Sequence, residues 1–95
     1  MAELNISQKT LSSVASLAIS QDKPIVLDYW KASQTGGCFV GTKASGEQLL
    51  VKTEDEYTSP IAKICQSEKD SPEYIICTEN SLYVVRSNIQ SRNLS

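Results

Sequence analysis

The sequence contains no histidine and little cysteine. Histidine is the commonest general base and a frequent metal ligand, so its absence excludes hydrolases that use a Ser-His or Cys-His pair. The three cysteines, Cys38, Cys65 and Cys77, are an odd number and form no CxxC arrangement, which argues against a disulfide framework and a four-thiolate zinc site. We therefore expect free and mostly buried thiols, with no catalytic residue, no cofactor and no bound metal.

An excess of positive charge and a long apolar run are also lacking. Nine Lys and Arg stand against eleven Asp and Glu, for a net charge of -2, so no nucleic-acid partner is expected. No window approaches the roughly 20 apolar residues that span a bilayer, and the first residues lack the order of charged and apolar segments typical of a signal peptide. We expect no membrane contact and a cytoplasmic location.

The size and composition are those of an ordinary globular chain. With 95 residues, of which 40% are hydrophobic, the chain can build one core but not two. We therefore expect a single domain over residues 1–95.

The N-terminal segment has the pattern of one amphipathic helix at about residues 6–20. Apolar side chains recur there at spacings of three and four, at Leu11, Val14, Ala15 and Ala18. Asn5 or Ser7 is suited to cap the first turn, and the segment from Gln21 to Pro24 supplies the stop signal.

After Pro24 the pattern changes to short β-prone runs separated by turn residues. The runs predict strands at about residues 24–32, 38–43, 47–52, 60–66, 73–78 and 82–87. Because most links are too short for a parallel crossover, neighbouring strands are expected to pair antiparallel. The sequence thus predicts an α+β fold, with one N-terminal amphipathic helix followed by a five- or six-stranded antiparallel meander, β-roll or barrel-like.

Alternation within the strands predicts which side chains face the core. It places Leu49 and Val51 together on the core face of the third strand, and Ile75 and Cys77 on the core face of the fifth. The run LYVV at residues 82–85 is apolar on both faces, so its second face needs a cover. The N-terminal helix is one candidate, and a partner strand pairing on an exposed edge is another.

The stretch GGCFVGTK, from Gly36 to Lys43, resembles a phosphate-binding loop in its glycine spacing only. That loop needs Lys before the hydroxyl residue and a helix after the second glycine, whereas Thr42 precedes Lys43 and Gly46 disfavours a helix. We expect a turn that enters a strand, with a bulge or a close backbone contact at Gly41. A small-ligand or nucleotide-binding regulatory domain that uses this turn remains an alternative.

The main functional expectation is a non-enzymatic protein-interaction or assembly subunit that self-associates or is held in a complex. Trp30, Tyr83 and Val85 are the candidate interface residues, because large aromatic side chains often anchor interfaces and because the last strand is apolar on both faces.

Two further possibilities concern chemical modification or reaction. A cysteine-dependent enzyme would use Cys38, which follows a flexible Gly-Gly turn. Ser59 and Ser71 each precede proline, which is the minimal pattern for proline-directed phosphorylation, although both dipeptides are also ordinary junctions between a turn and a strand.

Overall fold

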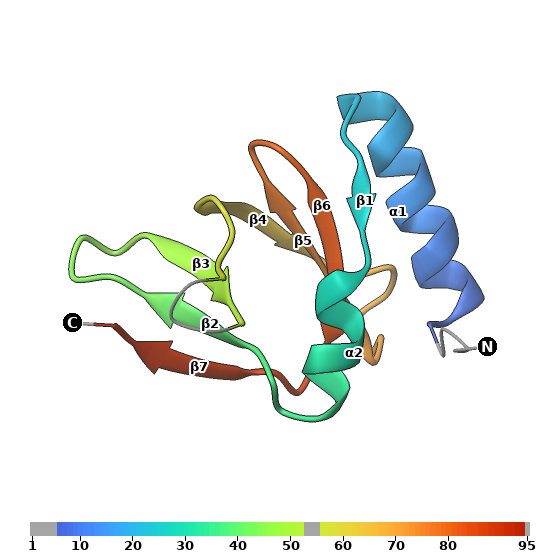
Figure 1. Ribbon diagram of the computed structural model, residues 1–95. Coiled ribbons are helices and arrows are strands. Elements are labelled where there is room, and N and C mark those ends of the chain that lie inside the picture. Colours follow the sequence, from blue (N-terminus) through green and yellow to red (C-terminus); the bar gives the residue numbers. More distant parts are fainter. Residues whose placement is uncertain (1–5, 53–55, 95) are drawn as a thin grey trace.

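The computed structural model describes residues 6–52 and 56–94 and shows an α+β architecture (Figure 1). The elements in chain order are α1 (Gln8–Gln21), β1 (Ile25–Val26), α2 (Asp28–Gln34), β2 (Phe39–Thr42), β3 (Gln48–Val51), β4 (Ile61–Cys65), β5 (Glu73–Thr78), β6 (Leu82–Arg86) and β7 (Gln90–Asn93). The predicted fold class and the N-terminal helix are confirmed, and the predicted strands from residue 38 onward match β2 to β6.

Helix α1 is defined at both ends by local chemistry. The Ser7 hydroxyl accepts a hydrogen bond from the Thr10 amide, as an N-cap does, whereas Asn5 lies outside the described residues. The helix ends at Asp22, whose φ of 53° is left-handed and whose amide donates to the carbonyl of Ala18.

The strands form two sheets, ordered β1-β6-β5-β4 and β3-β2-β7. Pairing is antiparallel in β2-β3, β4-β5 and β5-β6, but parallel in β1-β6 and β2-β7, so the prediction of a purely antiparallel meander is wrong. The parallel pairs join segments that are far apart in the sequence, with long stretches of chain between them. The expectation that short links join antiparallel neighbours therefore does not apply to these two pairs.

The strand predicted at residues 24–32 is also wrong beyond its first residues. Only Ile25–Val26 is extended, and Asp28–Gln34 forms α2. The Gly36-Gly37 pair, predicted as part of a turn that enters a strand, ends this helix: Gly36 has a φ of +76°, and the Gly37 amide donates to the carbonyl of Ala32 at 2.7 Å. Glycine in this conformation one residue beyond the C-cap is a common helix stop.

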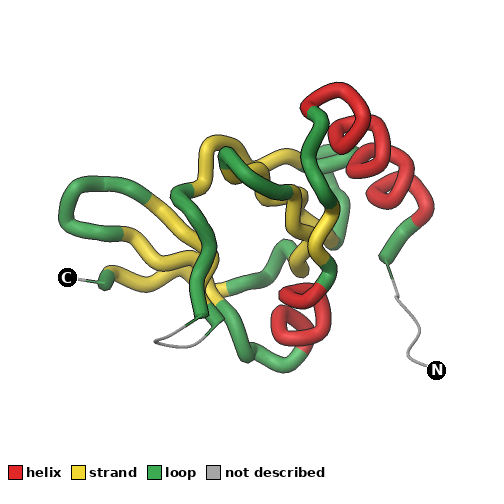
Figure 2. Tube along the Cα trace, turned by 45° about the horizontal axis from the view of Figure 1, so that its top comes forward, coloured by secondary structure: helices red, strands yellow, loops and turns green. Residues whose placement is uncertain are grey.

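The four-stranded sheet is the middle layer, with α1 on one face and the three-stranded sheet on the other (Figures 1 and 2). Two hydrophobic clusters correspond to these faces. One comprises Ile6, Val14, Trp30, Ile75, Cys77, Leu82 and Val84, and the other Tyr29, Cys38, Val40, Leu50, Ile76 and Val85. The predicted core positions Ile75 and Cys77 are confirmed.

Strand β6 is covered on both faces, pairs with β5 along one edge, and pairs with β1 at Leu82 and Tyr83 on the other. Leu82 and Val84 pack in the cluster that includes Val14 of α1, as expected for a helix cover. The predicted exposed edge is wrong, because β6 lies between β1 and β5. The parallel pairing with β1 occupies the start of that edge, and the Arg86 amide at its far end donates to the Ser33 hydroxyl of α2. The sequence pattern could not reveal these contacts.

Candidate binding cleft

The sheet β3-β2-β7 has apolar side chains on both faces. Val40 and Leu50 point inward and belong to the second hydrophobic cluster. Because side chains alternate along a strand, Phe39 and its partner Val51 point outward, away from the core. The outer face is therefore also apolar, although its side chains do not belong to the second hydrophobic cluster.

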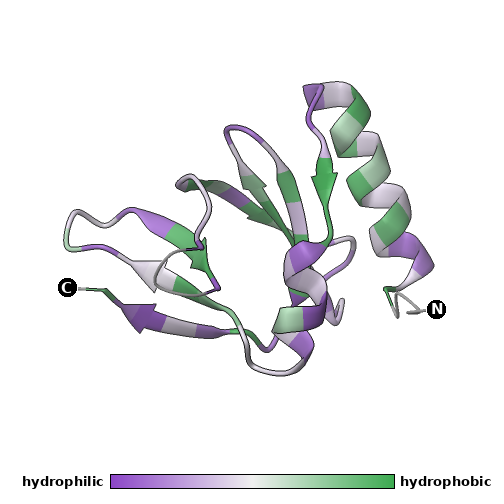
Figure 3. Ribbon diagram, in the orientation of Figure 1, coloured by the Kyte–Doolittle hydropathy of each residue, from purple (hydrophilic) through white to green (hydrophobic). Residues whose placement is uncertain are grey.

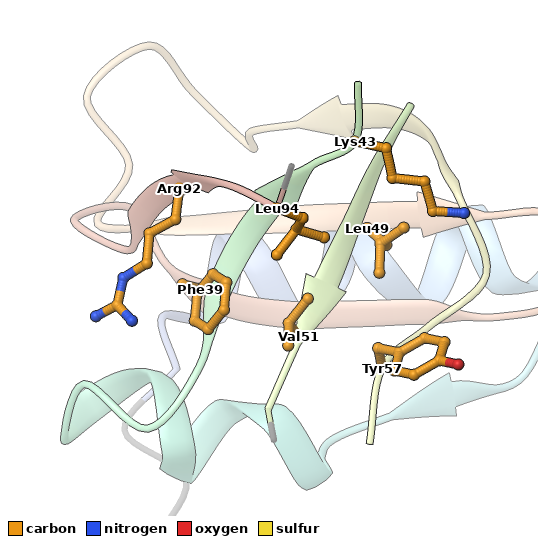
Figure 4. Close-up of a pocket in the computed structure, with 7 residues that line it drawn as sticks. All are labelled: Phe39, Lys43, Leu49, Val51, Tyr57, Arg92 and Leu94. Carbon is orange, nitrogen blue, oxygen red and sulfur yellow. The ribbon is translucent and has the colours of Figure 1, made fainter. Parts of the chain in front are cut away.

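A cleft of about 520 Å³ lies on this outer face (Figure 4). Its lining is mainly apolar: Phe39, Leu49, Val51, Tyr57 and Leu94, with Lys43 and Arg92 as the charged members. Leu49 and Val51 are 4% and 7% exposed and form the floor, whereas Tyr57 and Leu94 are 61% and 43% exposed. The volume lies in the range of ordinary ligand pockets.

Backbone pairing holds Tyr57 beside this face. The Thr58 amide donates to the Leu50 carbonyl at 2.9 Å, and the Leu50 amide donates to the Thr58 hydroxyl at 3.1 Å. Tyr57 is thereby set opposite Val51 in an isolated antiparallel bridge. This segment covers part of the outer edge of β3.

Gly41 makes the centre of the cleft possible. It pairs with Leu49 on one side and Arg92 on the other, and the Leu94 side chain lies directly above it. A Cβ on Gly41 would come within 2.7 Å of Leu94 Cδ1. The Leu94 amide donates to the Thr42 carbonyl at 2.8 Å, which holds this part of the chain in place. A bulge or a close backbone contact was expected at Gly41, whereas the close contact there is with the Leu94 side chain.

The charges at the cleft are both positive. The Arg92 guanidinium lies 4.6 Å from the centroid of the Phe39 ring, a cation–π contact, and donates to Gln90 Oε1 at 2.8 Å. Lys43 Nζ is 3.8 Å from Glu47 Oε1, and both side chains are about half exposed. Among the described residues that line the cleft there are two cations and no carboxylate.

The stretch from Gly36 to Lys43 does not form a phosphate-binding loop. After Gly41 the chain continues through β2 into a tight turn, in which the Lys43 amide donates to the Glu47 carbonyl and the Gly46 amide to the Lys43 carbonyl. No helix begins there. The stretch nevertheless contributes Phe39 and Lys43 to the cleft.

The predicted interface residues lie inside the protein. Trp30 and Val85 are 3% and 0% exposed, and half-buried Tyr83 makes an edge-to-face contact with Tyr29 at a centroid distance of 5.3 Å. Trp30 and Val85 therefore offer no side-chain surface to a partner. The exposed aromatic residue is Tyr57, which lies outside the predicted strands and was not among the predicted interface residues.

Cys38 is a buried thiol and offers no support for a reactive nucleophile. It is 2% exposed, and its Sγ lies 3.8 Å from the Tyr29 carbonyl as a weak donor. Burial raises the pKa of the Cys38 thiol to about 11, with an opposing contribution from Lys52, so little thiolate forms at neutral pH.

The two candidate phosphorylation sites differ in their surroundings. Ser59 is half-buried and accepts a hydrogen bond from the Asn80 side-chain amide at 2.8 Å. Ser71 is 5% exposed, and its hydroxyl donates to the Glu73 carbonyl at 3.1 Å. A kinase would reach the Ser71 hydroxyl only after local opening.

Glu73, 3% exposed, is the most buried carboxylate of the described residues. Its Oε1 accepts from the hydroxyls of Thr10 at 2.6 Å and Ser7 at 2.8 Å, and its Oε2 accepts from the Ser7 amide at 3.2 Å. Burial alone would raise the pKa of Glu73, but these hydrogen bonds and one from Ser71 outweigh it and lower the pKa. The bonds from Ser7 and Thr10 hold the start of α1 on β5, so the role of the cluster is structural.

No protein-family model matches the sequence, and comparisons with curated proteins and with solved structures found no match. Neither helix of the described chain has the length and apolar character required to cross a bilayer. Within residues 6–52 and 56–94, no group of three or more potential metal ligands is placed to hold an ion. The cleft is therefore the basis of the functional proposal.

Proposed function

We propose that the chain is a non-enzymatic protein-interaction subunit and that the cleft on β3-β2-β7 is its contact surface. The outer face of this sheet carries the proposal, because it groups apolar side chains with an exposed tyrosine and with an arginine that makes a cation–π contact. Tyrosine and arginine are enriched among the residues that dominate binding energy. The three free cysteines are compatible with a cytoplasmic location.

A different protein fits this cleft better than a second copy of the chain. In a two-fold symmetric pair the same patch of both copies would meet, which would bring Lys43 and Arg92 of each copy into one interface. The described lining offers no carboxylate to offset them. The sequence left self-association and a constitutive partner as alternatives, and the charges at the cleft favour the partner.

A small-ligand domain is the second candidate, favoured by the cleft volume of about 520 Å³ and by the position of Phe39 and Lys43 in its lining. An apolar carboxylate would place its chain on the floor and its charge beside Lys43. Such a ligand would raise the melting temperature by mass action, whereas a surface that binds only proteins would show no such effect.

The test of the proposed function is site-specific photo-crosslinking in the cells that produce the chain. A benzophenone side chain replaces Tyr57, which is exposed at the cleft, or Lys69, which is exposed elsewhere. We expect a protein adduct of defined mass from position 57 and none from position 69. An adduct with twice the mass of the chain would favour self-association, and equal labelling from both positions would refute the proposal.

A further inference from the structure

We propose that the segment bound by the cleft is acidic and carries one aromatic or large aliphatic side chain. This inference rests on the proposed function and names the chemistry of the partner. Two features of the cleft motivate it: an apolar floor, and cations without carboxylates in the described lining.

The position of the charges suits a chain that crosses the cleft. Figure 4 shows Arg92 and Lys43 on opposite sides of the apolar side chains, with Phe39, Leu49 and Leu94 between them. An anchor side chain over Leu49 and Leu94 would therefore have a cation on either side. Carboxylates that precede and follow the anchor in the partner would meet these cations.

The cations are available for such contacts. Arg92 is exposed, its guanidinium carbon lies 4.6 Å from the centroid of the Phe39 ring, and only Nη2 has a hydrogen bond in the described structure, to Gln90. Guanidinium edges bind carboxylates through paired hydrogen bonds. Lys43 is paired with Glu47 at 3.8 Å, which is long for a charge-assisted hydrogen bond, and a better-placed carboxylate can replace it.

The openness of the face favours a peptide segment over a small molecule. Pockets for small ligands bury most of the ligand surface, whereas Tyr57 and Leu94 at this cleft are 61% and 43% exposed. A peptide does not need to be enclosed, because its flanking residues extend over the rim. The affinity should fall with added salt, since exposed charges are screened at short range.

The test uses three fluorescein-labelled peptides and the intact chain. The first has the core Glu-Glu-Phe-Glu-Glu, the second replaces every Glu by Gln, and the third replaces Phe by Ala. Fluorescence anisotropy gives the affinities, and amide chemical shifts give the location of the contact. We expect the first peptide to bind about tenfold more tightly than either of the others, with shifts concentrated in β2, β3 and β7.

Charge-reversal variants locate the effect. Lys43→Glu with Arg92→Glu should weaken the first peptide about tenfold or more, while the control pair Lys31→Glu with Lys69→Glu makes the same change in net charge at exposed positions outside the cleft. The control should bind within about twofold of the parent. If the reversal variant unfolds, Lys43→Gln with Arg92→Gln tests the same contact without adding negative charge.

Several results would overturn this inference. Equal binding of the Gln peptide would remove the acidic requirement, and no binding of any of the three peptides would reject the proposed class of segment. Stronger binding of laurate or of a labelled oligouridine would assign the cleft to another class of ligand. Crosslinking at position 57 reports separately on the proposed function, so a failed acidic preference and a failed interaction role are distinguishable.

Discussion

Replacement of Glu73 by Gln should destabilise the protein strongly at neutral pH. The carboxylate accepts hydrogen bonds from Thr10, the Ser7 hydroxyl and the Ser7 amide at 2.6, 2.8 and 3.2 Å, in a position where it is 3% exposed. A glutamine keeps one acceptor oxygen but turns an NH₂ group toward another donor. It also removes a negative charge from the N-terminus of α1.

The magnitude follows from the cost of unpaired buried groups. Hydrogen bonds to a charged group contribute about 1.5–3 kcal/mol each, and part of this is retained by the glutamine oxygen. We expect Glu73→Gln to lower the free energy of unfolding by about 2–3 kcal/mol. For a chain of this size that corresponds to a fall in melting temperature of roughly 10–20 °C.

The pH dependence provides an independent check, and its sign is fixed by the lowered pKa of Glu73. A carboxyl group with a lower pKa when folded than when unfolded stabilises the protein fully above its unfolded pKa, which is about 4.3 for glutamate. That contribution is lost as the pH falls through the folded pKa. The stability gap between the parent and Glu73→Gln should therefore narrow between about pH 5 and pH 3.

Urea unfolding followed by the fluorescence of Trp30, the single tryptophan, measures both quantities. Glu68→Gln is the matched control, because Glu68 forms an exposed ion pair with Lys9 at 2.9 Å and the same chemical change there should have little effect. If Glu73→Gln matches the parent at pH 7, or if the gap stays constant down to pH 3, then an ionised and hydrogen-bonded Glu73 is not what holds α1 to β5.

Further predictions concern the thiols, a helix end and the core. Cys38 and Cys77, both buried with raised pKa values, should resist maleimide at pH 7 while half-buried Cys65 reacts sooner, and rapid labelling of Cys38 in the folded protein would contradict this. Asp22→Gly should raise the free energy of unfolding by about 0.5–1 kcal/mol, measured by urea unfolding, because it relieves a left-handed residue at the end of α1. Leu50→Ala, at 0% exposure, should lower it by about 2–5 kcal/mol in the same assay, and a smaller loss would place Leu50 outside the core.

Local patterns predicted the elements whose stability is mainly local. Short β-prone runs between turn residues located β5 at Glu73–Thr78 and β6 at Leu82–Arg86, and the Ser7 cap with three-and-four spacing located α1. Local patterns did not predict elements whose conformation depends on contacts between residues far apart in the sequence. Strand β7 (Gln90–Asn93) is exposed and hydrophilic (Figure 3), and it is extended because β2 pairs with it.

The cleft was not predicted because the core-facing positions of β3 were assigned one residue out of register. The run at 48–51 has three consecutive apolar residues, so alternation alone allows either Leu50 or the pair Leu49 and Val51 to face the core. The prediction chose the pair, whereas Leu50 belongs to the core cluster. Leu49 and Val51 are buried as predicted, but beneath the cleft, where Tyr57 and Leu94 also lie. Both faces of β3 are apolar, and the sequence does not distinguish a core face from a binding face.

The glycines of the GGCFVGTK stretch show how one spacing can arise from unrelated requirements. Gly36 is needed because a φ of +76° ends α2, and nothing lies within 4 Å of where its Cβ would be. Gly41 is needed for a different reason. It lies in a strand, where any residue fits the backbone, but the Leu94 side chain occupies the space that a Cβ would take. A phosphate-binding loop requires both glycines for one ligand. Here one glycine stops a helix and the other admits Leu94 to the outer face, so the resemblance in spacing carries no shared chemistry, and the second glycine helps to form the cleft instead.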